Sequence, residues 1–191
     1  MWHKNGVMTP PGTSRRRPPL DSGRLEELAL RYVGKYATTR RKLRAYLARK
    51  IRERGWSEPR EPELDALADR FCELGYVDDA AYALAKSRAL SSRGYGKRRL
   101  DEKLRLAGVE EEDGMAARDH ADAEAVEAAL RFAERRRIGP FGSEPPDPNR
   151  REKAIAAMLR AGHSFGIARA IAGMAPGAPV DVDELREQAR H

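Results

Sequence analysis

Few residues of this 191-residue chain have the types and spacing that catalysis or metal binding requires. The adjacent carboxylates Asp78 and Asp79 could bind a metal or transfer a proton. No further carboxylate or histidine follows them at a fixed offset, so helix capping and complementarity with a helix dipole explain the pair better. The four histidines show no ligand spacing, and the single cysteine, Cys72, excludes an intramolecular disulfide and a cysteine-based zinc site.

A second candidate for chemistry is the segment Arg93-Gly94-Tyr95-Gly96-Lys97, which could hold a phosphate at a helix N-terminus. It does not follow a predicted strand, so a turn with a positive φ at glycine is the better interpretation. The chain also lacks the Walker-type, Gly-x-Ser-x-Gly and His-Glu-x-x-His motifs. We therefore expect a protein that is not an enzyme and uses no metal or cofactor.

Basic side chains are the most informative group, because they are concentrated in particular segments. The chain has 37 Lys and Arg against 30 Asp and Glu, a formal net charge of +7. Residues 31–54 hold ten Lys or Arg and one acid, whereas residues 58–79 hold eight acids and two arginines. A second basic segment, residues 93–105, precedes an acidic one, residues 110–127. Charge therefore alternates along the chain.

Apolar residues recur at helical spacing between the two ends of the chain, and aromatic residues make up only 6%. Three copies of a pattern, apolar-x3-apolar-x3-Gly, end at Gly55, Gly108 and Gly162, with glycines 53 and 54 residues apart. Helices commonly end at glycine, but a matched spacing in three copies favours an internal repeat.

The sequence thus predicts an all-α fold, an elongated tandem array of three three-helix modules. We expect a bend or mobile joint near Asp113-Gly114, because glycine interrupts the predicted helix over residues 110–120. The repeat also favours a monomer. The expected parts are a disordered basic tail over residues 1–23, modules over residues 24–77, 78–121 and 122–174, and a polar C-terminal tail over residues 175–191.

The basic segments fall on the middle helix of successive modules, so stacking would align them in one positive stripe. Such a stripe suits a phosphate backbone or an acidic protein groove. The alternative is a set of solvated faces neutralised by the neighbouring acidic helices. The candidate contact residues for a partner or DNA are Arg40, Arg41, Lys42, Arg44, Lys97, Arg98, Arg99, Lys103, Arg135, Arg136 and Arg137.

No apolar run approaches the roughly 18 residues that a membrane span needs. The N-terminus also lacks the apolar segment of a secretory signal. We therefore expect a cytoplasmic protein without membrane contact.

Three segments resemble the RecX family of recombination regulators. Residues 75–83 and 93–109 are similar to the family's central signature, and residues 158–164 to a stretch of its third module. The likeness extends from Leu25 to Gly173, with His163 where an aromatic residue is usual. The signature positions are Gly75, Tyr76, Asp78, Asp79, Tyr82, Gly96, Leu100, Leu104 and Gly108.

The resemblance implies a bacterial protein built from three-helix repeats that binds in the groove of the RecA filament on DNA. It further implies inhibition of RecA ATP hydrolysis, strand exchange and coprotease activity in recombination, DNA repair and the SOS response, with modest affinity for DNA. One alternative is a helical module that binds DNA or RNA directly without a recombinase. Another is an adaptor for some other helical protein.

Overall fold

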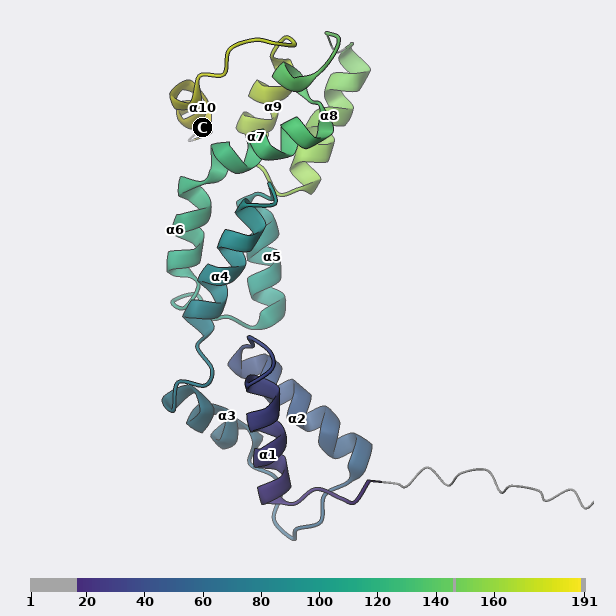
Figure 1. Cartoon of the computed structure of the whole chain (residues 1–191), viewed down its shortest axis with the longest axis vertical. Coiled ribbons are helices and arrows are strands. Elements are labelled where there is room, and N and C mark those ends of the chain that lie inside the picture. Colours follow the sequence, from purple (N-terminus) through teal and green to yellow (C-terminus); the bar gives the residue numbers. More distant parts are fainter. Residues whose placement is uncertain (1–16, 146, 190–191) are drawn as a thin grey trace, which may run out of the picture.

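The computed structural model describes residues 17–145 and 147–189. These residues form an elongated array of helices, with no strand among them beyond an isolated bridge between Leu20 and Trp56 (Figure 1). The predicted all-α array is therefore confirmed. The helices are α1 (Ser22–Val33), α2 (Arg40–Arg54), α3 (Leu64–Glu73), α4 (Asp79–Ser91), α5 (Lys97–Ala107), α6 (Met115–Ala123), α7 (Ala125–Arg136), η1 (Gly139–Phe141), α8 (Pro148–Arg160), α9 (Phe165–Gly173) and α10 (Val182–Ala189).

The array has three separate clusters of buried side chains along its length. Helices α1–α3 enclose the first around Leu43, Leu47 and Phe71. Helices α4–α6 enclose a second that is rich in alanine, and α7–α10 enclose the third. Small side chains let α4 and α6 pack closely, since Ala83 and Ala117 are both fully buried. Each cluster is small, so each group of helices depends on its neighbour for further burial.

The repeated glycines mark the ends of the middle helices. Gly55, Gly108 and Gly162 follow α2, α5 and α8 with φ values of 86°, 72° and 97°. These values lie in a region that glycine enters without steric cost, so the chain can turn sharply there. The repeated glycines therefore each follow a middle helix with a positive φ, but the three helix ends differ: Gly55 and Gly108 are C-caps with ψ values of 167° and 32°, whereas Gly162 comes one residue after the C-cap of α8.

The predicted N-terminal tail is too long. Its residues 1–16 lie outside the described part of the chain, but residues 17–23 are ordered against the first module. The side chain of Leu20 is fully buried, its N–H donates to Gly55 O (2.9 Å), and its carbonyl accepts from Ser57 N (2.9 Å). The prediction was wrong because Leu20 is a single apolar residue in a proline-rich segment. Its hydrogen-bond partners, Gly55 and Ser57, lie more than 30 residues farther along the chain.

The predicted polar C-terminal tail is also wrong for about half of its length. Residues 182–189 form α10, which lies against α7 and α9 (Figure 1). Leu185 is buried in the third cluster, and Arg186 forms an ion pair with Glu127 of α7 (2.5 Å). Leu185, the partly buried Val182 and the ion pair of Arg186 therefore hold a segment whose composition is largely polar.

The expected bend lies elsewhere than predicted. Gly114 precedes α6 and does not interrupt it, so Asp113-Gly114 belongs to the turn between α5 and α6. Helix α6 is firmly packed, since Ala117 and Ala121 are buried. The chain changes direction instead at Glu124, the single residue between α6 and α7. The second and third groups of helices are joined there without a loop.

Burial of Leu20 gives the first prediction. Replacing Leu20→Ala removes apolar contacts and leaves a cavity, so the free energy of unfolding should fall by about 3 kcal/mol. Urea denaturation followed by circular dichroism measures this change. Leu30→Ala, at a side chain that is 50% exposed, is the matched control and should change the value by no more than about 0.5 kcal/mol. Equal effects of the two substitutions would contradict the packing of residues 17–23.

Candidate interaction surface

The N-terminus of α2 joins the first group of helices to the second. Thr39 caps α2 by accepting from Lys42 N (3.2 Å), and its buried hydroxyl donates to Ala107 O at the end of α5 (2.6 Å). The N–H of Arg40 donates to the carboxylate of Asp79 on α4 (2.8 Å). Unpaired backbone groups at helix ends are thus satisfied across the boundary between the two groups.

Two of the predicted contact residues belong to this joint. The aliphatic part of Arg41 covers Gly108 so closely that a Cβ there would collide with it, and its guanidinium reaches Arg105 O (3.5 Å). The ammonium of Lys42 contacts the Tyr82 hydroxyl and lies 4.4 Å from the centre of that ring. Both side chains hold the two groups of helices together.

Two further contact residues of α2 are paired with acids of α3. Arg40 forms an ion pair with Asp69, and Arg44 Nε lies 2.6 Å from Asp65 Oδ1. The hydrogen bond from Arg40 lowers the pKa of Asp69 and raises the pKa of Arg40. At this end of α2, acids of the adjacent helix α3 therefore neutralise the basic side chains, as the alternative interpretation expected.

Helix α5 carries both paired and unpaired cations. Lys97 binds Asp122 at the end of α6, and Arg99 Nη1 lies 2.8 Å from Glu102. Arg98 and Lys103 have no acidic partner within residues 17–145 and 147–189. Arg98 is also exposed. Arg105 in the last turn of α5 is likewise exposed and has no acidic partner among the described residues. The free positive charge of α5 therefore comes from Arg98, Lys103 and Arg105.

The last three contact residues do not lie on a middle helix. Arg135 and Arg136 form the final turn of α7, and Arg137 follows in a left-handed conformation with a φ of 54°. The middle helix of the third group is α8, which follows α2 and α5 along one side of the array (Figure 1). The four basic residues of α8, which were not among the predicted contact residues, are Arg150, Arg151, Lys153 and Arg160.

The basic residues predicted to form one positive stripe therefore fall into two sets, one engaged within the structure and one available to a partner. The α2 residues are occupied by ion pairs and by the joint, whereas Arg98 and Lys103 on α5 remain available. Counting charges along the sequence could not distinguish these cases, because ion-pair partners come from other helices.

Four of the nine signature residues, Asp79, Tyr82, Gly96 and Gly108, take part in the joints. Asp78 caps α4 by accepting from Ala81 N (2.7 Å). Asp79 accepts from Arg40 N at the N-terminus of α2 (2.8 Å). Burial raises the pKa of Asp79 in spite of its bond from Arg40 N–H. Gly96 touches Gly162 so closely that a Cβ at Gly96 would collide with the Gly162 carbonyl. Of the remaining signature positions, Tyr76 is exposed, Gly75 has a φ of 74°, and Leu100 and Leu104 fill the second cluster.

The second joint is made of direct hydrogen bonds between the α4–α5 loop and the α8–α9 loop. Gly96 N donates to Ala161 O (3.0 Å), and Arg98 N donates to Gly162 O (3.2 Å). His163 Nε2 lies 3.1 Å from Gly94 O, and because a carbonyl can only accept, Nε2 carries the proton. As predicted, His163 lies in a loop before the helix cap Ser164, but its side chain is buried, with 2% exposed.

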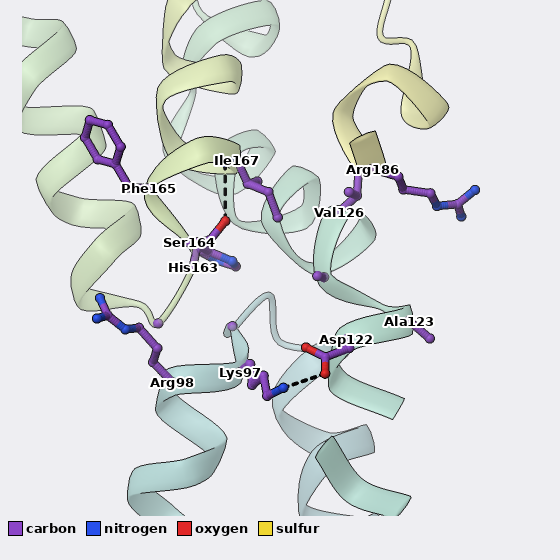
Figure 2. Close-up of a pocket in the computed structure, with 13 residues that line it drawn as sticks. Lys97, Arg98, Asp122, Ala123, Val126, His163, Ser164, Phe165, Ile167 and Arg186 are labelled. Carbon is purple, nitrogen blue, oxygen red and sulfur yellow. Dashed lines mark hydrogen bonds and ion pairs between the residues drawn. The ribbon is translucent and has the colours of Figure 1, made fainter. Parts of the chain in front are cut away.

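A cleft of about 750 Å³ opens beside this joint, between α5, α7 and α9. Figure 2 shows Val126 and Ile167 on its apolar wall and the pair Lys97–Asp122 below them. Phe165 also lines the cleft and is 58% exposed. The cleft was not predicted, because its residues come from five helices, α5, α6, α7, α9 and α10, and no single segment of the sequence encodes their shared location.

None of the helices in the described ranges has the length and apolar character to cross a membrane. Within the same residues, no group of three or more His, Cys, Asp or Glu side chains could hold a metal ion.

No family profile matches the sequence. The chain is 35% identical over 164 residues to "Regulatory protein RecX" of Myxococcus xanthus, covering 77% of this chain and 83% of that protein. It is 32% identical over 140 residues to the protein of the same name from Agrobacterium fabrum, covering 71% and 74%. A crystal structure of RecX from Lactobacillus salivarius has a TM-score of 0.63 and 20% identity, covering 78% of this chain and 92% of that chain. The last comparison shows a shared fold.

The buried imidazole of His163 gives the second prediction. Burial lowers its pKa to about 4, against a usual value near 6.5, although the bond to Gly94 O acts in the opposite direction. Below about pH 6.5 the unfolded chain therefore binds a proton that the folded chain does not, and stability is lost until about pH 4. We expect the parent to lose about 2–3 kcal/mol relative to His163→Phe between pH 7 and about pH 4.5.

Urea denaturation of both proteins at each pH measures this difference, because contributions of other groups cancel between parent and variant. His163→Phe also loses the bond to Gly94 O, but that loss does not vary with pH. A stability difference that stays constant across the range would contradict a buried, neutral His163.

Proposed function

The chain belongs to the RecX family, and we propose on this basis that it is a non-enzymatic regulator of the RecA recombinase filament. In this proposal it is a cytoplasmic monomer that binds along the filament on DNA and inhibits ATP hydrolysis, strand exchange and coprotease activity. It would thereby act in recombination, DNA repair and the SOS response. The observation that carries the proposal is the likeness to regulatory RecX proteins over most of the chain.

The shape of the molecule supports binding along an extended partner. An elongated array exposes far more surface than a single core of the same length. Its two joints are fixed by buried groups, the Thr39 hydroxyl at the first and His163 at the second. A rigid array that occupies a filament groove would oppose the subunit motions that accompany ATP hydrolysis.

The charge distribution supports α5 as the principal contact. Arg98 and Lys103 carry charge that no described acid neutralises, so they can meet an acidic filament surface or DNA phosphates. Arg40 and Arg44 would have to give up Asp69 and Asp65 to do the same. Charge complementarity of this kind increases the specificity for one partner and the rate of association with it.

The third prediction tests this contact with a RecA ATPase assay on single-stranded DNA, with the purified chain titrated in. The parent should inhibit hydrolysis. Arg98→Glu with Lys103→Glu should raise the concentration for half-inhibition by about five-fold or more, because two attractive charges become repulsive.

The matched control reverses two exposed arginines of α1, Arg24→Glu with Arg31→Glu, and should inhibit as the parent does. A parent without any effect on hydrolysis would refute the proposed function. Equal inhibition by the α5 variant and the parent would instead refute α5 as the contact surface.

A further inference from the structure

A hollow of about 500 Å³ lies between the α4–α5 loop, α7 and α8, and its charged lining is entirely arginine. No acidic side chain of the described residues lines it, although acids and bases alternate elsewhere in the chain. It therefore differs from the faces of α2, where carboxylates of α3 pair with the arginines. The main lining residues are Arg93, Tyr95, Phe132, Arg135, Arg136 and Arg160.

None of the four arginines has an acidic partner within the described residues. Arg135 Nη1 donates to the backbone carbonyl of Arg93 (2.5 Å). The guanidinium carbons of Arg135 and Arg136 lie 5.9 and 5.8 Å from the centre of the Phe132 ring. Packing on this buried ring orients both planar groups while leaving their positive charge unneutralised.

Helix ends explain only part of this concentration of charge. Arg135 and Arg136 occupy the last turn of α7, Arg160 the last turn of α8, and Arg93 follows the end of α4. Each helix C-terminus carries a partial charge of roughly −0.5, so three ends offset well under half of four full positive charges. A strong positive excess remains in the hollow.

We propose that this hollow binds phosphate groups of a nucleotide, either free or within a nucleic-acid strand. All four cations are arginines, whose planar forks match phosphate oxygens with two parallel hydrogen bonds. The volume suits a small ligand, and the partly exposed ring of Tyr95 adds an aromatic surface at the same place. The site needs no recombinase, so it goes beyond the proposed function and stands or falls independently of it.

The test uses the purified full chain and two probes at low ionic strength. A labelled oligothymidylate followed by fluorescence anisotropy represents a strand, and ADP followed by calorimetry represents a free nucleotide. The variant is Arg136→Gln with Arg160→Gln, whose side chains are exposed and make no hydrogen bond in the described structure. The control is Arg52→Gln with Arg169→Gln, two exposed arginines outside the hollow with the same change of charge.

We expect the parent to bind at least one probe, and the hollow variant to lose about ten-fold or more in affinity for that probe. The control should lose less than about three-fold. If the strand is the ligand, the slope of log affinity against log salt should also fall by about 1.4, since two phosphate contacts disappear. If the free nucleotide is the ligand, only ADP binding should respond to the variant.

Two results would overturn the site. One is a parent that binds neither probe, and the other is a hollow variant that binds both probes as the parent does. Circular dichroism and urea denaturation that match the parent establish that the variant is folded. Because RecA is absent from the assay, either negative result leaves the proposed regulation of the filament untouched.

Discussion

Close backbone contact between the groups of helices is the constraint on which the rest of the array depends. At the second joint, the Gly96 N–H donates to Ala161 O, and the Gly96 and Gly162 backbones touch where no Cβ would fit. At the first, a buried hydroxyl of Thr39 reaches Ala107 O. Hydrogen bonds of this kind fix both distance and direction, because buried donors and acceptors without partners are costly. Three small cores can therefore act as one extended body.

The same constraint determines which charges are free. Because the N-terminus of α2 is drawn against α4 and α5, Arg41 and Lys42 are used in packing, and the α3 acids neutralise Arg40 and Arg44. Farther along the array, Arg98 and Lys103 have no acidic partner in the part of the chain that the structure describes. In a chain with a net charge of +7, some basic side chains are thus used in internal ion pairs and packing, and a smaller set remains on the surface for partners.

The parts of the structure that could be predicted from the sequence are those encoded locally. Helical periodicity and the repeated glycines give the all-α array, since a helix ending depends on a few adjacent residues. The tail boundaries could not be predicted, because Leu20 and Leu185 are buried by residues far away in the chain. The ion-pair partners of α2 and the arginine-lined hollow likewise arise where separate helices meet. The composition gives the sign of the net charge, but it does not show which acidic side chain lies next to each basic one.

The second joint brings these features together. The α4–α5 loop supplies Gly94 and Gly96 to the joint and Arg93 and Tyr95 to the hollow. A phosphate held by Arg93 and Arg160 would therefore bridge the second and third groups of helices. A ligand that binds only one arrangement stabilises that arrangement by mass action. Occupancy of the hollow would then favour the relative orientation of α5 and α8, the two basic helices that follow one another along the array.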